Sequence, residues 1–130
     1  MRTCIAAVCM LLMLTETHCK KDKLKALQGS WKLAYYDGGF VGRRMYPNPG
    51  ELTILKFSDS TAEKYAHDTL LSKGTFRIGT EMDNSVNKQV PYIYCEEIAN
   101  GAINIVADTL SIYDINIADG RSSHYIRYKE

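Results

Sequence analysis

The chain has 130 residues, of which 45% are hydrophobic, and its 16 basic and 15 acidic side chains leave a formal net charge of +1. A balance so close to neutral excludes the strong positive field of a nucleic-acid-binding protein. The length is typical of one domain with its own core. Its four cysteines, among them Cys4 and Cys9, are too few for a disulfide-dense scaffold.

Residues 1–19 have the features of an export signal. Arg2 is followed by an uninterrupted apolar run from Cys4 to Leu14. This run is shorter than the roughly 20 residues that a transmembrane helix needs, which favours a cleaved signal peptide over an anchor. The sequence therefore predicts an exported protein that is either secreted or held at the cell envelope.

Cys19 lies just beyond this apolar run and precedes a lysine-rich stretch, Lys20 to Lys25. A cysteine before a polar tether resembles the lipidation site of bacterial lipoproteins, which implies membrane attachment through a lipid on Cys19. Ordinary cleavage after Thr17 or Cys19 is the alternative. A third interpretation is a disulfide between Cys19 and Cys95, as exported proteins allow. Without that bridge, Cys95 is expected to be a buried free thiol.

The chain after the signal is predicted to be a short tether followed by one β domain. Residues 20–27 form the tether, with a helical turn over Lys21 to Leu27, and residues 28–130 form the domain. The candidate strands are rich in Tyr, Ile, Val and Thr, as half-buried strands are. They are Ser30–Asp37, Leu52–Ser58, Thr61–His67, Leu71–Ile78, Val90–Glu97, Ala102–Val106, Leu110–Asp114 and Ser123–Lys129.

The connections between these strands indicate an antiparallel meander. Turn sequences such as Asn100-Gly101 and Asp119-Gly120 favour hairpins, and two longer connections run from Gly38 to Gly50 and from Gly79 to Gln89. No long helix separates two strands, so neighbours are expected to pair antiparallel. Short antiparallel strands protect their edges best by closing, which predicts an all-β, up-and-down, eight-stranded barrel. An immunoglobulin-like sandwich is the alternative.

A resemblance to a known family lies at the two ends of this domain. Gly29-Ser30-Trp31, preceded by a helical turn, resembles the G-x-W opening of the lipocalins, and Tyr125-Ile126-Arg127 is similar to the last strand of small bacterial lipocalin-like proteins. The resemblance implies a barrel closed at one end by Gly29, Trp31 and Arg127. It also implies an exported, lipocalin-like binding module.

Trp31 and Arg127 are expected to meet for a physical reason as well. The first and last strands of a closed meander are neighbours, and a guanidinium over an indole ring contributes roughly 0.5–2 kcal/mol. Its donors can also satisfy carbonyl groups at the barrel floor. The alternative is that Trp31 is ordinary core and Arg127 is solvated surface.

The aromatic content suggests what the barrel holds. Nine tyrosines are present, many of them on candidate strands. Tyrosine combines an apolar ring with a hydroxyl group, which suits a pocket for a small apolar or amphipathic molecule. The same side chains can instead fill the barrel. In that case the protein is an envelope interaction protein or inhibitor that binds an unidentified protein partner through its loops.

The long loop Gly38–Gly50 is the candidate ligand-binding segment. Phe40, Met45 and Tyr46 are predicted to form an apolar lid, and Arg43 and Arg44 a cationic rim that favours amphipathic anions. The alternative is an irregular surface loop with solvated arginines.

Catalytic and metal-binding patterns are weak. His67-Asp68 and Ser122-Ser123-His124 contain suitable residue types but lie where turns or strand ends are expected, and no metal-ligand spacing such as HxH is present. The sequence therefore predicts no catalytic residues, no metal, no cofactor and no nucleic-acid partner.

Overall fold

The computed structural model describes residues 20–39 and 42–130. Residues 20–27 form a short helix, which matches the predicted helical turn, and the rest of the described chain is built from β-strands. The strands are β1 (Gly29–Gly38), β2 (Thr53–Ser58), β3 (Thr61–Ala66), β4 (Thr69–Thr75), β5 (Arg77–Asp83), β6 (Lys88–Tyr94), β7 (Gly101–Val106), β8 (Thr109–Tyr113) and β9 (Arg121–Tyr128). Within the described residues, no helix is long and apolar enough to cross a membrane.

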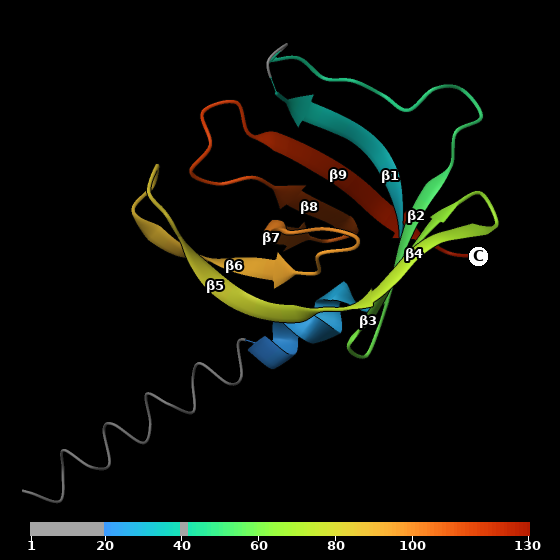
Figure 1. Ribbon diagram of the computed structural model, residues 1–130, viewed down its shortest axis with the longest axis horizontal. Helices are drawn as coiled ribbons and strands as arrows, with labels where there is room; N and C mark the ends of the chain where they lie inside the picture. Colours follow the sequence, from blue (N-terminus) through green and yellow to red (C-terminus); the bar gives the residue numbers. More distant parts are fainter. Residues whose placement is uncertain (1–19, 40–41) are drawn as a thin grey trace, which may run out of the picture.

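All nine strands belong to one antiparallel sheet with the order β4-β3-β2-β1-β9-β8-β7-β6-β5. Consecutive strands are neighbours except at β4–β5, and the pairing of β1 with β9 joins the two ends of the domain. The sheet curves strongly around its core, with the helix beneath it (Figure 1). The predicted all-β antiparallel meander is therefore confirmed, and a single sheet replaces the alternative two-sheet sandwich.

The sequence predicts eight strands, whereas the described residues form nine. The candidate strand Leu71–Ile78 is interrupted at Phe76, which separates β4 from β5, and the predicted connection Gly79–Gln89 contains most of β5. β4 and β5 are the two edges of the sheet and do not pair with each other, so hydrogen bonds do not close it into a barrel. The reason is that the chain changes partner at Phe76, because β4 pairs with β3 and β5, which follows it directly, pairs with β6.

The core lies on the concave side of the sheet. Trp31 and Leu33 alternate with more exposed residues along β1, and both are buried together with Leu55, Phe57 and other residues from most of the strands. A β-bulge then shifts the β1–β9 register between Leu33 and Tyr35. A bulge redirects the side chains that follow it. The concave face of β1 therefore carries odd-numbered residues before the bulge and Tyr36 after it.

Candidate functional site

The main candidate site is a hollow of about 500 Å³ on the concave side of the sheet, beyond the packed core, which we call the interior cavity. Residues from six strands and four connecting segments contribute to its wall, so it belongs to the fold as a whole. They are Tyr36, Glu51, Leu52, Thr53, Lys64, Ala66, His67, Leu71, Ile98, Ala99, Asn100, Ile112, Asp114, Arg121, Ser123 and Tyr125. Its size is typical of small-molecule sites.

Strand periodicity explains how these side chains reach the cavity. Arg121, Ser123 and Tyr125 are alternate residues of β9, and alternate residues of a strand share one face. Lys64 and Ala66 line the cavity from β3 in the same way and continue the face that carries the fully buried Ala62. The cavity is thus the open continuation of the side of the sheet that carries the core.

Tyr125 and Ile112 form the cavity floor. Both side chains are more than nine-tenths buried, and Tyr125 pairs in the sheet with Leu33 and Leu110 of the packed core. Burial raises the pKa of Tyr125 to about 12, so its phenol is neutral at physiological pH. The concave side of the sheet is therefore packed on one side of Tyr125 and hollow on the other.

The cavity wall carries charges of both signs. Lys64 and Arg121 are cationic, Glu51 and Asp114 are anionic, and neither cation forms an ion pair with another described residue. An Asp114 carboxylate oxygen accepts a hydrogen bond from the backbone N–H of Arg121 at 3.0 Å. Burial, and secondly the charge of Glu51, raise the pKa of the Tyr36 phenol. A wall of mixed polar and apolar groups suits an amphipathic molecule better than a purely apolar one.

The predicted ligand loop lies elsewhere. Phe40 is outside the described residues, and Arg43, Arg44, Met45 and Tyr46 are exposed and do not line the interior cavity. Their role in ligand binding stays a prediction.

Local contacts of this loop explain its position. Met45 forms a two-way backbone bridge with Tyr36, with N···O distances of 2.8 and 2.9 Å. The Arg44 guanidinium donates to both carboxylate oxygens of Asp37, at 3.0 and 3.2 Å, and lies 4.0 Å from the ring centroid of Tyr35. Hydrogen bonds from Arg44 hold the pKa of the Asp37 carboxyl below its usual value. Arg44 is therefore engaged in holding the loop against β1.

His124 joins this loop contact to the sheet. Its ring stacks on Tyr35 with centroids 4.4 Å apart, and its Nδ1 lies 2.9 Å from the Ser111 hydroxyl. Its Nε2 is 3.3 Å from an Asp37 carboxylate oxygen, an ion-pair distance without hydrogen-bond geometry. The residue types resemble a hydrolytic triad, and neither Ser111 nor His124 is among the residues that line the interior cavity. No cluster of metal-ligand residues occurs in the part of the chain that the structure describes.

Gly29, Trp31 and Arg127 lie together at the helix end of the sheet. The Arg127 guanidinium is 3.9 Å from the centroid of the Trp31 ring and donates to the carbonyl oxygens of Gln28 and Ala26, at 2.6 and 3.0 Å. The Trp31 indole N–H donates to the Leu27 carbonyl at 2.8 Å. These three bonds satisfy carbonyl groups at the helix C-terminus that would otherwise lack partners. The contacts are structural, and they connect the helix to β1 and β9.

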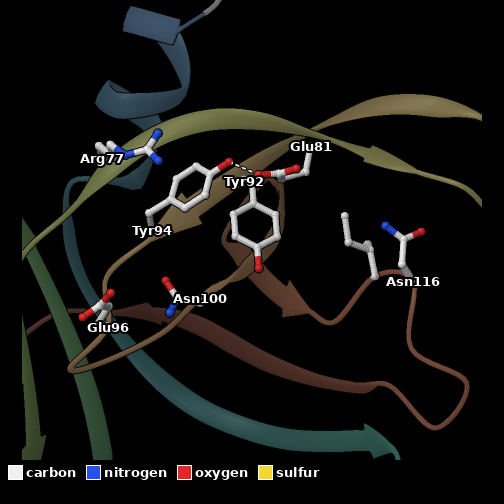
Figure 2. Close-up of a pocket in the computed structure, with 8 residues that line it drawn as sticks. Arg77, Glu81, Tyr92, Tyr94, Glu96, Asn100 and Asn116 are labelled. Atoms are coloured by element: carbon white, nitrogen blue, oxygen red, sulfur yellow. Dashed lines mark hydrogen bonds between the residues drawn. The ribbon is translucent and has the colours of Figure 1, made fainter.

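A second hollow, of about 520 Å³, lies along β5 and β6 (Figure 2). The Tyr94 hydroxyl donates to a Glu81 carboxylate oxygen, and the Arg77 guanidinium lies 3.6 Å from the Tyr94 ring centroid. Tyr92 stands beside Tyr94 with ring centroids 4.7 Å apart. Because Arg77 and Glu81 already engage Tyr94, this hollow offers fewer uncommitted groups than the interior cavity.

Comparison of the chain with protein-family models, curated proteins and solved structures gives no match. Sequence reasoning missed Lys64, Arg121 and Tyr36 as cavity residues. The alternation that identified Trp31 and Leu33 as core could have found Lys64, since it lies two residues from Ala62 on the same strand face.

Proposed function

We propose that the protein is an exported, lipocalin-like binding module that takes a small amphipathic molecule into the interior cavity, without catalysis. The observation that carries this proposal is a cavity of about 500 Å³ with a mixed wall, above a floor formed by buried Tyr125 and Ile112. The alternative, an envelope interaction protein or inhibitor, would require a barrel filled along its whole length. The interior cavity therefore favours the binding module.

The continuity of β4 and β5 supports the barrel part of this proposal. Phe76 alone separates them, so the two edges of the sheet belong to one nearly continuous stretch of chain. If β4 and β5 are taken as one bent strand, that strand pairs with β3 through its first half and with β6 through its second half. The polypeptide chain then connects the two edges of the sheet at Phe76, where no hydrogen bonds join them.

The arrangement of the cavity wall suggests how the ligand is oriented. Apolar parts of the molecule would contact Leu71, Ile112 and the Tyr36 ring, each buried CH₂ contributing about 0.8 kcal/mol. An anionic group would lie near Lys64 and Arg121, which can supply charge-assisted hydrogen bonds. The preferred ligand is therefore an amphipathic anion such as a fatty acid. This preference agrees with the one expected from the sequence but uses different cations.

Fluorescence titration of the chain with dansylaminoundecanoic acid tests the proposal. The parent protein should bind saturably, Ala66→Phe should weaken binding at least tenfold by filling the cavity, and Lys64→Met should weaken it about fivefold or more. Lys56→Met is the matched control, because Lys56 lies on the neighbouring strand β2 and does not line the cavity. Absence of saturable binding, or equal affinity in Ala66→Phe and the parent, would refute the cavity as the site.

The Arg43→Ala/Arg44→Ala variant tests the loop separately. If loss of these two arginines weakens binding as much as Lys64→Met does, the loop also contributes to the anion site.

The proposed export and the lipid on Cys19 are tested by mass spectrometry of the mature protein. An N-terminal Cys19 carrying acyl chains supports attachment to the membrane, and cleavage at Thr17 or an unmodified N-terminal Lys20 contradicts it.

A further inference from the structure

A third hollow lies where the helix meets the junction of β4 and β5. It has a volume of about 480 Å³ and is lined chiefly by Lys20, Lys21, Leu24, Phe76, Arg77 and Ile78, with Asp59 and Ser60 at its margin. We call it the basic cleft. It lies at the helix end of the sheet and shares no lining residue with the interior cavity.

The cleft combines an apolar floor with a cationic margin. Phe76 is buried at 6% exposure and also packs edge-on against Phe57, which fixes the floor to the core. Leu24 is exposed on the helix above it, at 38%. Lys20 and Lys21 supply two positive charges, and neither forms an ion pair with another residue in ranges 20–39 and 42–130. Arg77, whose guanidinium lies over the Tyr94 ring, adds a third charge beside them.

The single acidic residue of the cleft is Asp59, in the turn between β2 and β3. Gln28 is bonded to the backbone of this turn in both directions, as donor to the Asp59 carbonyl at 3.2 Å and acceptor from its N–H at 2.6 Å. The helix is therefore held against the turn, and the cleft is built from fixed elements. The whole chain carries a net charge of only +1, so this concentration of positive charge is local.

We infer that the basic cleft docks on an anionic bilayer surface, with Leu24 entering the interface and the two lysines contacting lipid headgroups. Two observations favour a bilayer over another occupant. An exposed apolar side chain between lysines is the pattern of interfacial helices, which bind through apolar burial together with attraction to anionic lipid. In addition, the candidate lipidation site Cys19 directly precedes Lys20 in the sequence. A lipid on Cys19 would be covalently attached one residue before the first lysine of the cleft.

This docking fixes the orientation of the molecule. The β5–β6 turn (84–87) projects away from the helix in Figure 1, so it would point away from the bilayer. The inference does not depend on what the interior cavity binds. It adds a second contact to any lipid anchor, and a single acyl chain alone gives only marginal, reversible binding.

Sedimentation with vesicles tests this inference on the full chain. Vesicles of phosphatidylcholine alone are compared with vesicles containing 30% phosphatidylglycerol, and the measured quantity is the ratio of the two partition constants. Residues 1–19 are the same in every variant, so the comparison between variants isolates the cleft residues. Lys20→Gln/Lys21→Gln should lower the ratio about 25-fold, at about fivefold for each lysine near an anionic surface. The preference should also weaken between 0.1 and 0.5 M salt.

The matched control is Arg43→Gln/Lys88→Gln, which removes the same charge from exposed sites outside the cleft. Leu24→Ser, compared with Val86→Ser at another exposed apolar position, tests the insertion of Leu24. A parent ratio near one, or equal losses in the two double variants, overturns the inference. A loss confined to the cleft variants supports it.

Discussion

Trp31 and Arg127 are direct partners in the register of β1 and β9, and the guanidinium lies 3.9 Å from the indole centroid. The two residues come from opposite ends of the domain, so their contact exists only when the first and last strands pair. Arg127 also donates to carbonyls of residues 26 and 28. One side chain therefore connects the helix, the first strand and the last strand.

Truncation of this pair should reveal their coupling. Trp31 is fully buried, so Trp31→Ala should lower the free energy of unfolding by roughly 3–5 kcal/mol. Arg127→Ala should cost less, and the double variant should be less destabilised than the sum of the two. Urea unfolding measures all three, and strict additivity would contradict an energetic role for the contact.

Gly29 provides an independent check of the same contact. Its φ is +108°, and a Cβ added there would lie 3.2 Å from Nη1 of Arg127. Gly29→Ala should therefore destabilise the protein through both backbone strain and displacement of the guanidinium. In the Arg127→Ala background the second effect disappears, so the loss from Gly29→Ala should shrink there. An equal loss in both backgrounds would show that backbone strain alone matters.

Much of this fold could be predicted from the sequence because strand alternation and turn residues are local signals. They place seven of the nine strands close to their observed positions, and the Trp31–Arg127 contact follows from strand order. The interruption at Phe76 could not be predicted in this way, because the β propensity of the segment continues through it. What separates β4 from β5 is the change of partner from β3 to β6, which is a tertiary event.

The candidate site could be predicted less well. The bulge after Leu33 reverses which tyrosine of the pair Tyr35 and Tyr36 faces the cavity, and no residue in that segment signals it. The sequence predicts Arg44 as a ligand contact, and in the structure its guanidinium is bonded to Asp37, near the end of β1. Local charge pairing of this kind depends on how a loop folds back, which periodicity does not reveal.

Asp37→Asn should loosen the loop that folds against β1. The variant removes the charge that attracts both Arg44 and His124, so the amides of Tyr36 and Met45 should lose protection from hydrogen exchange. Because Arg44 lowers the pKa of Asp37, the contact is present above the pKa of an unfolded aspartate. It is lost as the pH falls through the lower folded value.

Asp108→Asn is the control for this variant, since Asp108 is exposed and lies 3.9 Å from Arg127 at the other end of the sheet. It should leave the exchange of both amides unchanged. Unchanged protection in Asp37→Asn would mean that the backbone bridge between Tyr36 and Met45 holds the loop without the ion pair.

Cys95 should be unreactive in the folded protein. Its side chain is 2% exposed, and burial, followed by the charge of Glu97, raises the pKa of the thiol. Reaction requires the thiolate, so alkylation by iodoacetamide at pH 8 should be slow in buffer and fast in urea. Peptide mass spectrometry distinguishes Cys95 from the cysteines of residues 1–19. Rapid labelling of Cys95 in buffer would contradict its buried position.

The last prediction concerns stability at alkaline pH and follows from Tyr125. The folded protein holds this phenol neutral up to a pKa of about 12, whereas the ordinary value is 10.0. Between these values the folded state retains a proton that the unfolded state has lost, so stability falls as the pH rises through that window. The slope approaches about 1.4 kcal/mol per pH unit for this one group.

Urea unfolding from pH 9 to 11.5 should show a weaker fall in the free energy of unfolding in Tyr125→Phe than in the parent. Tyr46→Phe, at a ring that is 68% exposed, should behave like the parent. The same slope in Tyr125→Phe and the parent would mean that the Tyr125 phenol is exposed to solvent in the folded protein. The description of a packed core that ends at Tyr125, with the interior cavity beyond it, would then be wrong.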